Sequence, residues 1–367
     1  MSLKPRPEIN SLCVCPHGGL EYGELLALGI HPEKVLDFSV CTNPFMPPPQ
    51  IKEIRLGSMA VEHYPDSEVT ELRYKLAQKL GIPPEIILMG SGSTELIRLV
   101  TLTYLRPGDS VLILEPTYGE YEVASKIAGA VVVKQRIKAE DGFLPQVEMT
   151  LALIKQYKPR VVFICNPNNP TGKYLSRQEL EMLCDSIVDG LLVLDEAYLA
   201  FVEGIWPSTD LVLRGNTVIL RSMTKDFGLS GLRLGYAIAS REIIDSLRLV
   251  CPPWNVNIVA QKVGAMVLED VSYFEQTRQK IKEAKQFLVS ELSLFGYSLH
   301  SSDTHYFLVQ VGNAKMFRTV LLEHGIQVRD CRSFGLPDYI RIGTRTLPEC
   351  KILISTIMEI KNKGDFK

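Results

Sequence analysis

The chain has 367 residues, of which 46% are apolar and 22% charged, and its formal net charge is −2. This composition is typical of a globular protein, and the length favours two domains over a single core. The near-neutral charge excludes strong binding to nucleic acid or to an anionic membrane surface, and no apolar run is long enough to span a bilayer.

Cysteine usage and the first residues indicate a cytoplasmic protein. The eight cysteines are scattered and form no Cys-x-x-Cys pair, so we expect reduced thiols and no metal site. Cys13 and Cys15 are separated by one residue, which is a poor spacing for a metal. Met1 to Arg6 carry charge but lead into no apolar signal segment.

An N-terminal arm rich in Pro and Gly is expected over residues 1–45, and a large domain over residues 46–256. In the large domain, short apolar runs alternate with amphipathic stretches, which predicts an α/β fold with a mostly parallel sheet covered by helices. The expected strands are 86–89, 111–114, 131–133, 161–164, 191–194, 218–220 and 236–239, and the first of them alternate with expected helices at 93–104 and 118–127.

The pattern changes at residue 257, where we expect a smaller α+β domain that runs to residue 367. Long amphipathic stretches predict helices, whereas the segment 296–311 is typical of strands and turns. The expected helices are 261–268, 273–294, 315–324 and a last helix from residue 347 onward.

Polar segments follow several of the predicted strands, and ligands gather at the carboxyl ends of strands in open parallel sheets. Ser222–Lys225 follows the strand that ends near Leu220. A lysine placed there can form a Schiff base with a carbonyl cofactor. Taken alone, Lys225 is explained more simply as an exposed surface residue.

Asp195 ends the apolar run that starts at Leu191. A carboxylate after a buried strand is costly unless it meets a cation, and a protonated ring nitrogen would supply one. An apolar strand that ends in Asp and Glu also resembles a magnesium-binding segment of nucleotide hydrolases. The chain lacks the Gly-x-x-x-x-Gly-Lys-Ser/Thr motif that such a site requires.

Asn166–Gly172 is either a tight turn or a place where an amide, that of Asn169, donates to a phenolic oxygen of a ligand. Tyr198 is placed to add a second donor to the same oxygen.

Gly90–Glu95 is a glycine-rich turn that opens a helix, so its free backbone N–H groups suit a phosphate, although a capped helix start is the simpler explanation. The third glycine of a dinucleotide motif is missing. Ser222 and Arg233 would complete the phosphate site. Together these segments describe one ligand with a phosphate, a phenolic oxygen, a ring nitrogen and an aldehyde.

On Asn166–Gly172, Leu194–Tyr198 and Ser222–Gly235, the sequence resembles the class I/II aminotransferase superfamily, fold type I of the pyridoxal-phosphate enzymes. The resemblance implies that pyridoxal phosphate is the cofactor and that the chain forms a homodimer with shared active sites. The residues implied at the cofactor are Lys225 for the Schiff base, Asp195 for the pyridine nitrogen, Asn169 and Tyr198 for the phenolic oxygen, and Ser93, Thr94, Ser222 and Arg233 for the phosphate.

Two tyrosines have implied roles at the cofactor as well. Tyr118, in Pro116–Gly119, matches the residue that stacks on the cofactor ring. Tyr64, in His63–Asp66, matches the residue that reaches the phosphate of the neighbouring subunit's cofactor.

Within the superfamily, the chain is similar to the branch of histidinol-phosphate aminotransferases and L-threonine-O-3-phosphate decarboxylases of cobalamin synthesis. The segments His63–Asp66 and Pro253–Asn257 fit both enzymes. In the arm, His17–Gly19 and Leu36–Ser39 are similar to the decarboxylase, whereas Val40–Thr42 departs from its pattern.

Decarboxylation of the phosphorylated amino acid is therefore the first expectation, and amino transfer is the alternative. The two reactions share almost every residue and differ in which substrate bond is aligned with the ring. A cofactor-binding regulator is a remote third possibility, because the arm is too short for a DNA-binding domain and no basic stripe is present.

The resemblance also implies residues for a small phosphorylated substrate. Arg341, in Tyr339–Gly343, matches the arginine that binds the substrate carboxylate, which suits a planar guanidinium. Arg329 is the candidate for the substrate phosphate, although a surface ion pair explains it equally well. His17 and Asn43 could assist from the arm, or His17 could hold the arm in place.

Overall fold

The computed structural model describes residues 3–10, 12, 14–52, 54–55, 57, 60–269 and 271–364. Its largest element is a seven-stranded sheet with the strand order β2-β8-β7-β6-β5-β3-β4. The strands are β2 (Ile87–Gly90), β3 (Ser110–Glu115), β4 (Val131–Arg136), β5 (Val161–Cys165), β6 (Leu191–Asp195), β7 (Thr217–Ser222) and β8 (Gly235–Ile238). Strand β8 runs antiparallel to both of its neighbours, and the remaining pairs are parallel.

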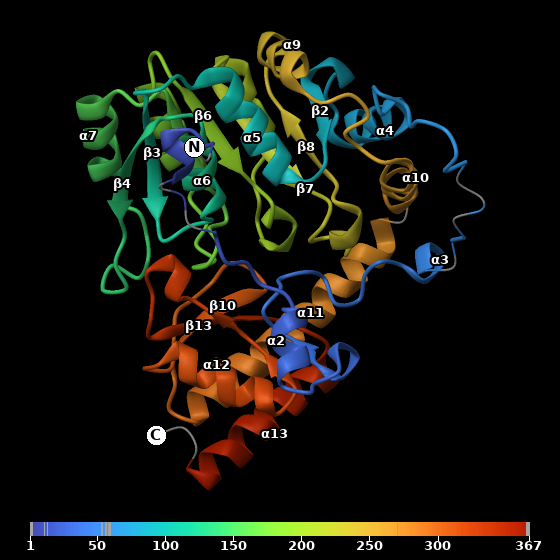
Figure 1. Ribbon diagram of the computed structural model, residues 1–367, viewed down its shortest axis with the longest axis vertical. Helices are drawn as coiled ribbons and strands as arrows, with labels where there is room; N and C mark the ends of the chain where they lie inside the picture. Colours follow the sequence, from blue (N-terminus) through green and yellow to red (C-terminus); the bar gives the residue numbers. More distant parts are fainter. Residues whose placement is uncertain are drawn as a thin grey trace.

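Helices cover both faces of this sheet (Figure 1). Side chains alternate along β6, so that Leu192 and Leu194 join one buried cluster and Leu191 and Val193 join the other. The first cluster is covered by α4 (Thr70–Leu80), α7 (Val147–Tyr157), α8 (Arg177–Ser186) and α10 (Ile258–Val267). The second is covered by α5 (Ser93–Tyr104), α6 (Glu120–Ile127) and α9 (Arg241–Val250).

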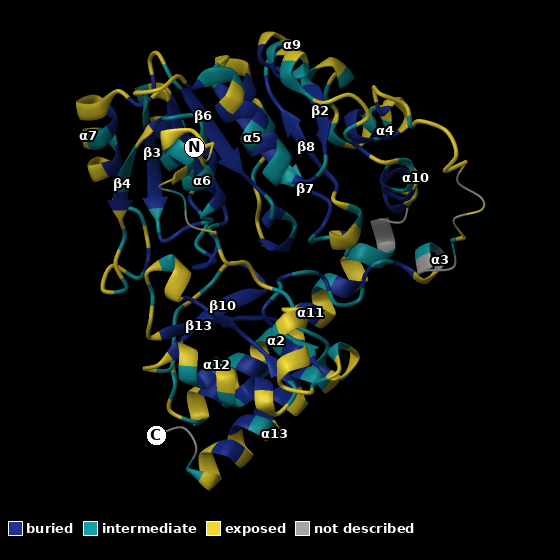
Figure 2. Cartoon of the chain, in the orientation of Figure 1, coloured by how far each residue is buried: buried dark blue, intermediate teal, exposed yellow. Residues whose placement is uncertain are grey.

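The C-terminal part of the chain has its own sheet and core. Its four strands lie in the order β12-β13-β10-β9 and are all antiparallel. They are β9 (Ser298–Leu299), β10 (Tyr306–Gln310), β12 (Arg329–Asp330) and β13 (Tyr339–Gly343), with α11 (Val271–Leu294), α12 (Ala314–Glu323) and α13 (Leu347–Lys363) beside them. Figure 2 shows each of these helices with one buried and one exposed side, as an amphipathic pattern requires.

The arm packs against both parts. Helix α1 (Pro7–Asn10) contacts α6, and β1 (Leu36–Asp37) pairs in parallel with β11 (Ile326–Gln327) of the C-terminal part. Helix α2 (Tyr22–Ala27) buries Leu25 against Leu322 of α12, and α3 (Pro49–Lys52) follows the arm. The domain boundaries after residues 45 and 256 stay a prediction.

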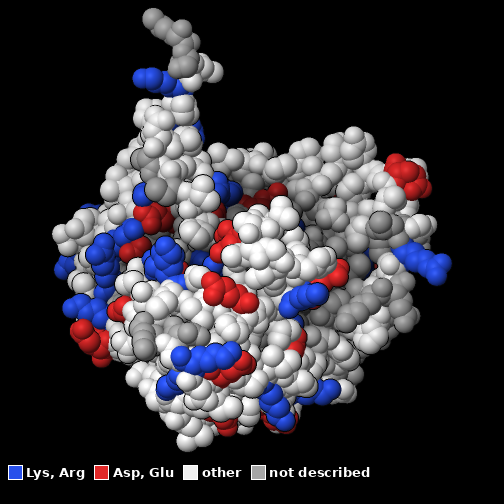
Figure 3. All heavy atoms as spheres, turned by 60° about the horizontal axis from the view of Figure 1, so that its bottom comes forward, with Lys and Arg blue, Asp and Glu red and all other residues white. Residues whose placement is uncertain are grey.

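Short 3₁₀ helices connect many of these elements. They cover Pro32–Lys34, Pro84–Ile86, Leu199–Phe201, Ser208–Arg214, Ser230–Leu232 and Arg332–Phe334. Among the described helices, none combines the length and the apolar character that a membrane crossing requires. On the face drawn in Figure 3, basic and acidic side chains are intermixed.

The predicted elements agree closely with those observed, with small differences at their ends. The helix expected at 93–104 is α5, residue for residue. The helix expected at 118–127 begins at Glu120, because Tyr118 and Gly119 form the turn before it. The helix expected at 261–268 starts earlier, at Ile258, where the side chain of Asn257 accepts a hydrogen bond from the N–H of Ala260.

Candidate active site

One cavity at the carboxyl ends of the parallel strands gathers the residues predicted for the cofactor, with the exception of Tyr64. Its lining contains Ser93, Thr94, Tyr118, Asn169, Asp195, Tyr198, Ser222, Lys225 and Arg233. It also contains Tyr121, Cys165, Ala197 and Thr224, which the sequence analysis did not single out. The residues come from segments far apart in the chain, which the sheet brings together.

Lys225 lies just beyond the end of β7, and its amine is 5.7 Å from the centre of the Tyr198 ring. Its backbone carbonyl accepts a hydrogen bond from the N–H of Asn43 over 2.8 Å, which joins this loop to the arm. Burial lowers the pKa of the Lys225 amine. A lowered pKa favours the neutral amine, which is the form that attacks a carbonyl group.

Asp195 ends β6 and is 3% exposed. Its Oδ2 accepts a hydrogen bond from the Tyr121 hydroxyl over 2.8 Å, and its Oδ1 accepts one from the Ala197 N–H over 3.0 Å. Burial raises the pKa of Asp195 to about 6, against the effect of these two hydrogen bonds. Within the part of the chain that the structure describes, no basic side chain forms an ion pair with this buried carboxylate. A protonated ring nitrogen in the cavity would supply a cation, so the site fits a pyridine ring.

The start of α5 is built for an anion. Gly92 precedes the helix with φ of +80°, and no side chain caps the first N–H groups. A Cβ atom on Gly92 would lie 2.8 Å from Nη2 of Arg233, so glycine allows the guanidinium to approach the helix start. Arg233 itself has φ of +56°, an uncommon conformation for a long side chain. Ser93 stands at the first helical position, and a phosphate would meet these groups together.

Hydroxyl groups complete this end of the cavity. The Ser222 and Thr224 hydroxyls lie 2.6 Å apart, and the hydroxyls of Thr94 and Tyr118 lie 3.1 Å apart. Burial raises the pKa of Tyr118 to about 12, so the phenol stays protonated. Hydroxyl pairs of this kind can turn a proton toward a phosphate oxygen.

Asn169 is oriented by Arg341. The Arg341 guanidinium donates from Nη1 to Oδ1 of Asn169 and from Nη2 to the carbonyl of Ser39, the latter over 2.6 Å. The amide oxygen of Asn169 is thereby used, and its Nδ2 is left to donate into the cavity. This is the orientation that a phenolic oxygen requires.

The two predicted substrate arginines are direct neighbours across strands β12 and β13. Both are buried, with 8% of Arg329 and 4% of Arg341 exposed. Arg329 donates from Nη2 to the Pro16 carbonyl and to the Ser333 hydroxyl, each over 2.6 Å. Within the described residues, neither arginine has a carboxylate partner, and the pKa of Arg329 is lowered by burial and by Arg341. Two adjacent buried cations of this kind form an anion site.

The arm residues have different surroundings. His17 is half exposed, and its Nε2 lies 3.2 Å from Oε1 of Glu120. Asn43 is buried and already bonded, because its Nδ2 donates to the Thr277 hydroxyl over 2.8 Å and its Oδ1 accepts from the Phe45 N–H over 3.0 Å. The amide of Asn43 therefore joins the arm to α11, and its predicted substrate contact would be additional to that role.

Tyr64 lies outside the cavity. Its side chain is 78% exposed and stacks on Trp254, with ring centres 4.3 Å apart. An exposed aromatic pair is compatible with a contact to a neighbouring subunit. The role of Tyr64 at a neighbour's cofactor stays a prediction.

Tyr121 is a functional candidate that the sequence analysis missed. It is fully buried, stacks on Phe163 with ring centres 4.9 Å apart, and holds Asp195. The available signal was its spacing, because Tyr121 follows Tyr118 by three residues within the stretch 118–127 that the sequence predicts to be helical.

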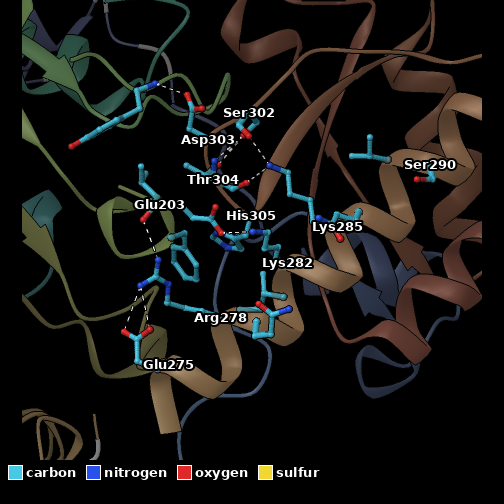
Figure 4. Close-up of a pocket in the computed structure, with 17 residues that line it drawn as sticks. Glu203, Glu275, Arg278, Lys282, Lys285, Ser290, Ser302, Asp303, Thr304 and His305 are labelled. Carbon is cyan, nitrogen blue, oxygen red and sulfur yellow. Dashed lines mark hydrogen bonds and ion pairs between the residues drawn. The ribbon is translucent and has the colours of Figure 1, made fainter. Parts of the chain in front are cut away.

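A second, larger cavity lies beside α11 and is lined by its cations (Figure 4). Lys282 pairs with Glu203 over 2.8 Å, Arg278 donates to the Val202 carbonyl over 3.2 Å, and Lys285 donates to the Ser302 and Thr304 carbonyls over 2.6 Å. Carboxylates also line this cavity, where Glu203 pairs with Lys282 and Glu275 with Arg278, so its cations are partly neutralised, unlike the pair Arg329 and Arg341.

Comparisons with known proteins show the family to which the chain belongs. The sequence model of the family "Aminotransferase class I and II" matches residues 33–357. A histidinol-phosphate aminotransferase of Thermoanaerobacter pseudethanolicus is 35% identical over 323 residues, which are 86% of this chain and 90% of that protein.

Solved structures share the fold. The histidinol-phosphate aminotransferase of Sinorhizobium meliloti in complex with pyridoxal-5'-phosphate superimposes with a TM-score of 0.89 at 21% identity, over 99% of each chain. The L-threonine-O-3-phosphate decarboxylase of Porphyromonas gingivalis gives a TM-score of 0.78 at 24% identity, over 89% of this chain and 99% of that one. The chain thus belongs to the class I and II aminotransferases, a family of pyridoxal-phosphate enzymes.

Proposed function

We propose that the chain is an aminotransferase that takes the amino group of histidinol phosphate and passes it to a dicarboxylic keto acid. Eight curated relatives at 32–35% identity are histidinol-phosphate aminotransferases, which supports the reaction that the sequence analysis placed second. The single observation in the structure that carries the proposal is the buried cross-strand pair Arg329 and Arg341.

This pair suits both substrates of an amino transfer. A phosphate monoester carries nearly two negative charges at neutral pH, and a dicarboxylic keto acid carries two as well. Two adjacent guanidinium groups can bind either dianion with paired hydrogen bonds. The fixed position of Arg341, between Asn169 and the Ser39 carbonyl, would set the distance from the bound anion to the cofactor.

The remaining residues have roles that follow from their positions. Pyridoxal phosphate, when bound, supplies an electron sink for the carbon that bears the amino group. Asp195 would hold the proton on the ring nitrogen, and the start of α5 with Arg233 would hold the phosphate. Lys225, whose amine has a lowered pKa, would move the proton from the substrate carbon as a general base.

Decarboxylation of L-threonine O-3-phosphate is the second candidate, and the arm is the observation that favours it. A Cβ atom on Gly18 would lie 2.5 Å from the Ser39 carbonyl, so glycine is needed for the arm to reach this position. There Pro16 meets Arg329 and His17 lies beside Tyr118. An arm that contacts a phosphate-binding arginine is compatible with a small phosphorylated amino acid.

Two product assays on the enzyme loaded with pyridoxal phosphate separate the candidates. In the first, histidinol phosphate and 2-oxoglutarate are supplied, and glutamate is measured. In the second, O-phospho-L-threonine is supplied without a keto acid, and carbon dioxide is measured. The proposal is supported if glutamate forms and if the variant Arg341→Gln forms much less of it. Many turnovers of carbon dioxide release without glutamate formation would overturn it in favour of the decarboxylase.

A further inference from the structure

We propose that Cys15, His17 and Glu120 form a zinc site that fastens the arm to the start of α6. One ligand atom from each residue lies within 4.8 Å of the other two, and His17 Nε2 is 3.2 Å from Glu120 Oε1. Ligand atoms around a tetrahedral zinc ion are roughly 3.3–3.8 Å apart, given bonds of about 2.0–2.3 Å. A small inward movement of the side chains would therefore complete three bonds, with the fourth position open to water.

The chemistry of the three residues matches zinc. A thiolate, a carboxylate and a neutral imidazole together balance the charge of a divalent ion, and sulfur with nitrogen selects zinc over magnesium or calcium. Arg98 donates to Oε2 of Glu120 over 2.9 Å, which leaves Oε1 for the ion and orients the carboxylate. Bonds of this kind to the outer oxygen are typical around metal ligands.

The position of the thiol is a separate observation. A Cβ atom on Gly119 would lie 2.5 Å from Sγ of Cys15, so the thiol occupies space that glycine leaves at the start of α6. The hydrogen bond described for this thiol is a long contact of 3.9 Å to the carbonyl of the next residue, Pro16. The half-exposed ring of His17 leaves a path for an ion from solvent.

Without an ion, the surroundings oppose the thiolate. Burial and then the charge of Glu120 raise the pKa of the Cys15 thiol. A bound cation reverses this balance, because it is the largest charge in the site and deprotonates a coordinating thiol. Zinc binding should then release a proton and strengthen with rising pH.

The sequence predicted no metal here, because Cys13 and Cys15 are poorly spaced. That argument considered neighbours along the chain, whereas Glu120 is 103 residues from His17. Cys13 lies outside the described residues and is not part of the proposed site.

Zinc would also affect catalysis through the arm. The His17 ring is 5.7 Å from the ring of Tyr118, which lines the active-site cavity. A His17 side chain that binds zinc could no longer contact the substrate. We expect zinc to raise KM for the phosphorylated substrate. This consequence rests on the proposed function, whereas metal binding itself does not.

The test is a cobalt titration of the enzyme loaded with pyridoxal phosphate. Cobalt in a tetrahedral site with a thiolate ligand gives absorption bands at longer wavelengths than the cofactor. We expect one cobalt ion per chain, displaced by zinc, with the bands abolished in Cys15→Ser. Loss of a residue that only contacts a metal ligand lowers the affinity roughly 10- to 100-fold. His17→Ala and Glu120→Gln remove ligands themselves, so they should lower the zinc affinity by at least this amount.

Cys251→Ser is the matched control, because Cys251 is also a partly exposed free cysteine, is not part of the cluster and lines a different cavity. It should bind cobalt as the parent does. The cofactor's own absorbance reports that each variant is folded. Absence of the cobalt bands in the parent enzyme, or their persistence in Cys15→Ser, would overturn the proposal, and neither result depends on which reaction the enzyme catalyses.

Discussion

Tyr121→Phe tests how the protein controls the charge of Asp195. The change removes the hydroxyl that donates to Oδ2 over 2.8 Å and leaves the ring stacked on Phe163. A hydrogen bond to a charged group contributes about 1.5–3 kcal/mol, which corresponds to about 1–2 pKa units. Because the Tyr121 bond lowers the pKa of Asp195 against burial, the pKa should rise from about 6 by this amount.

The expected result is weaker cofactor binding near neutral pH. With the pKa raised by this amount, about half to nine-tenths of Asp195 is protonated at pH 7 and gives the ring nitrogen no carboxylate partner, so the affinity for pyridoxal phosphate should fall about 2- to 10-fold at pH 7. Part of the loss should be recovered at about pH 9, where the carboxyl ionises again. The assay is an equilibrium titration of the cofactor-free protein, followed by the absorbance of the bound cofactor.

Tyr157→Phe, at the exposed end of α7, is the control and should leave the affinity unchanged. An affinity and pH profile of Tyr121→Phe that equal those of the parent protein would refute the reasoning. In that case the hydroxyl of Tyr121 would have no influence on the charge of Asp195.

Asp195→Asn should stabilise the cofactor-free protein. A carboxyl whose pKa rises from 3.8 to about 6 on folding lowers the unfolding free energy as pH increases through that interval. The unfolding free energy that Asp195→Asn gains over the parent should therefore be larger at pH 8 than at pH 4 by on the order of 3 kcal/mol. Thermal unfolding at the two pH values measures this gain, and equal gains at both would contradict the prediction. Arg341→Lys should raise KM for the phosphorylated substrate about 10- to 100-fold with a smaller effect on kcat, because an ammonium group lacks the two parallel N–H donors of a planar guanidinium. Steady-state kinetics measures both constants, and an unchanged KM would remove Arg341 from the substrate site. Gly228→Ala should lower the unfolding free energy by at least about 2 kcal/mol, since Gly228 has φ of +63° and a Cβ there would lie 2.7 Å from the Met46 carbonyl oxygen. Gly231→Ala, which has open space, is its control, and equal stability of the two variants would contradict the prediction.

Much of the fold could be predicted because apolar runs report buried strands directly. The run Leu191–Leu194 is fully buried in β6, and the helix predicted at 93–104 is α5. The residues of a strand do not determine whether it runs parallel or antiparallel to its neighbours, so the antiparallel direction of β8 could not be predicted. That direction depends on the connection from β7 through the loop that carries Lys225.

The placement of Asn169, Asp195 and Lys225 at one edge of the sheet could be predicted because each ends or follows a parallel strand, and parallel strands bring such ends together. Contacts between distant segments could not. The Tyr121 bond to Asp195 spans 74 residues, and the pairing of Arg329 with Arg341 depends on the register of two short strands. Asn43 shows the same limit, because its buried partner Thr277 lies 234 residues away.

The most direct test of the account is the identity of the lysine that holds the cofactor. Borohydride reduction of the enzyme loaded with pyridoxal phosphate, followed by proteolysis and mass spectrometry of the peptides, locates it. We expect a single modified residue, Lys225, and no modification in Lys225→Ala. Lys285 is the principal competitor, because burial lowers the pKa of its amine to about 8. Modification of Lys285, with Lys225 unmodified, would contradict the central claim.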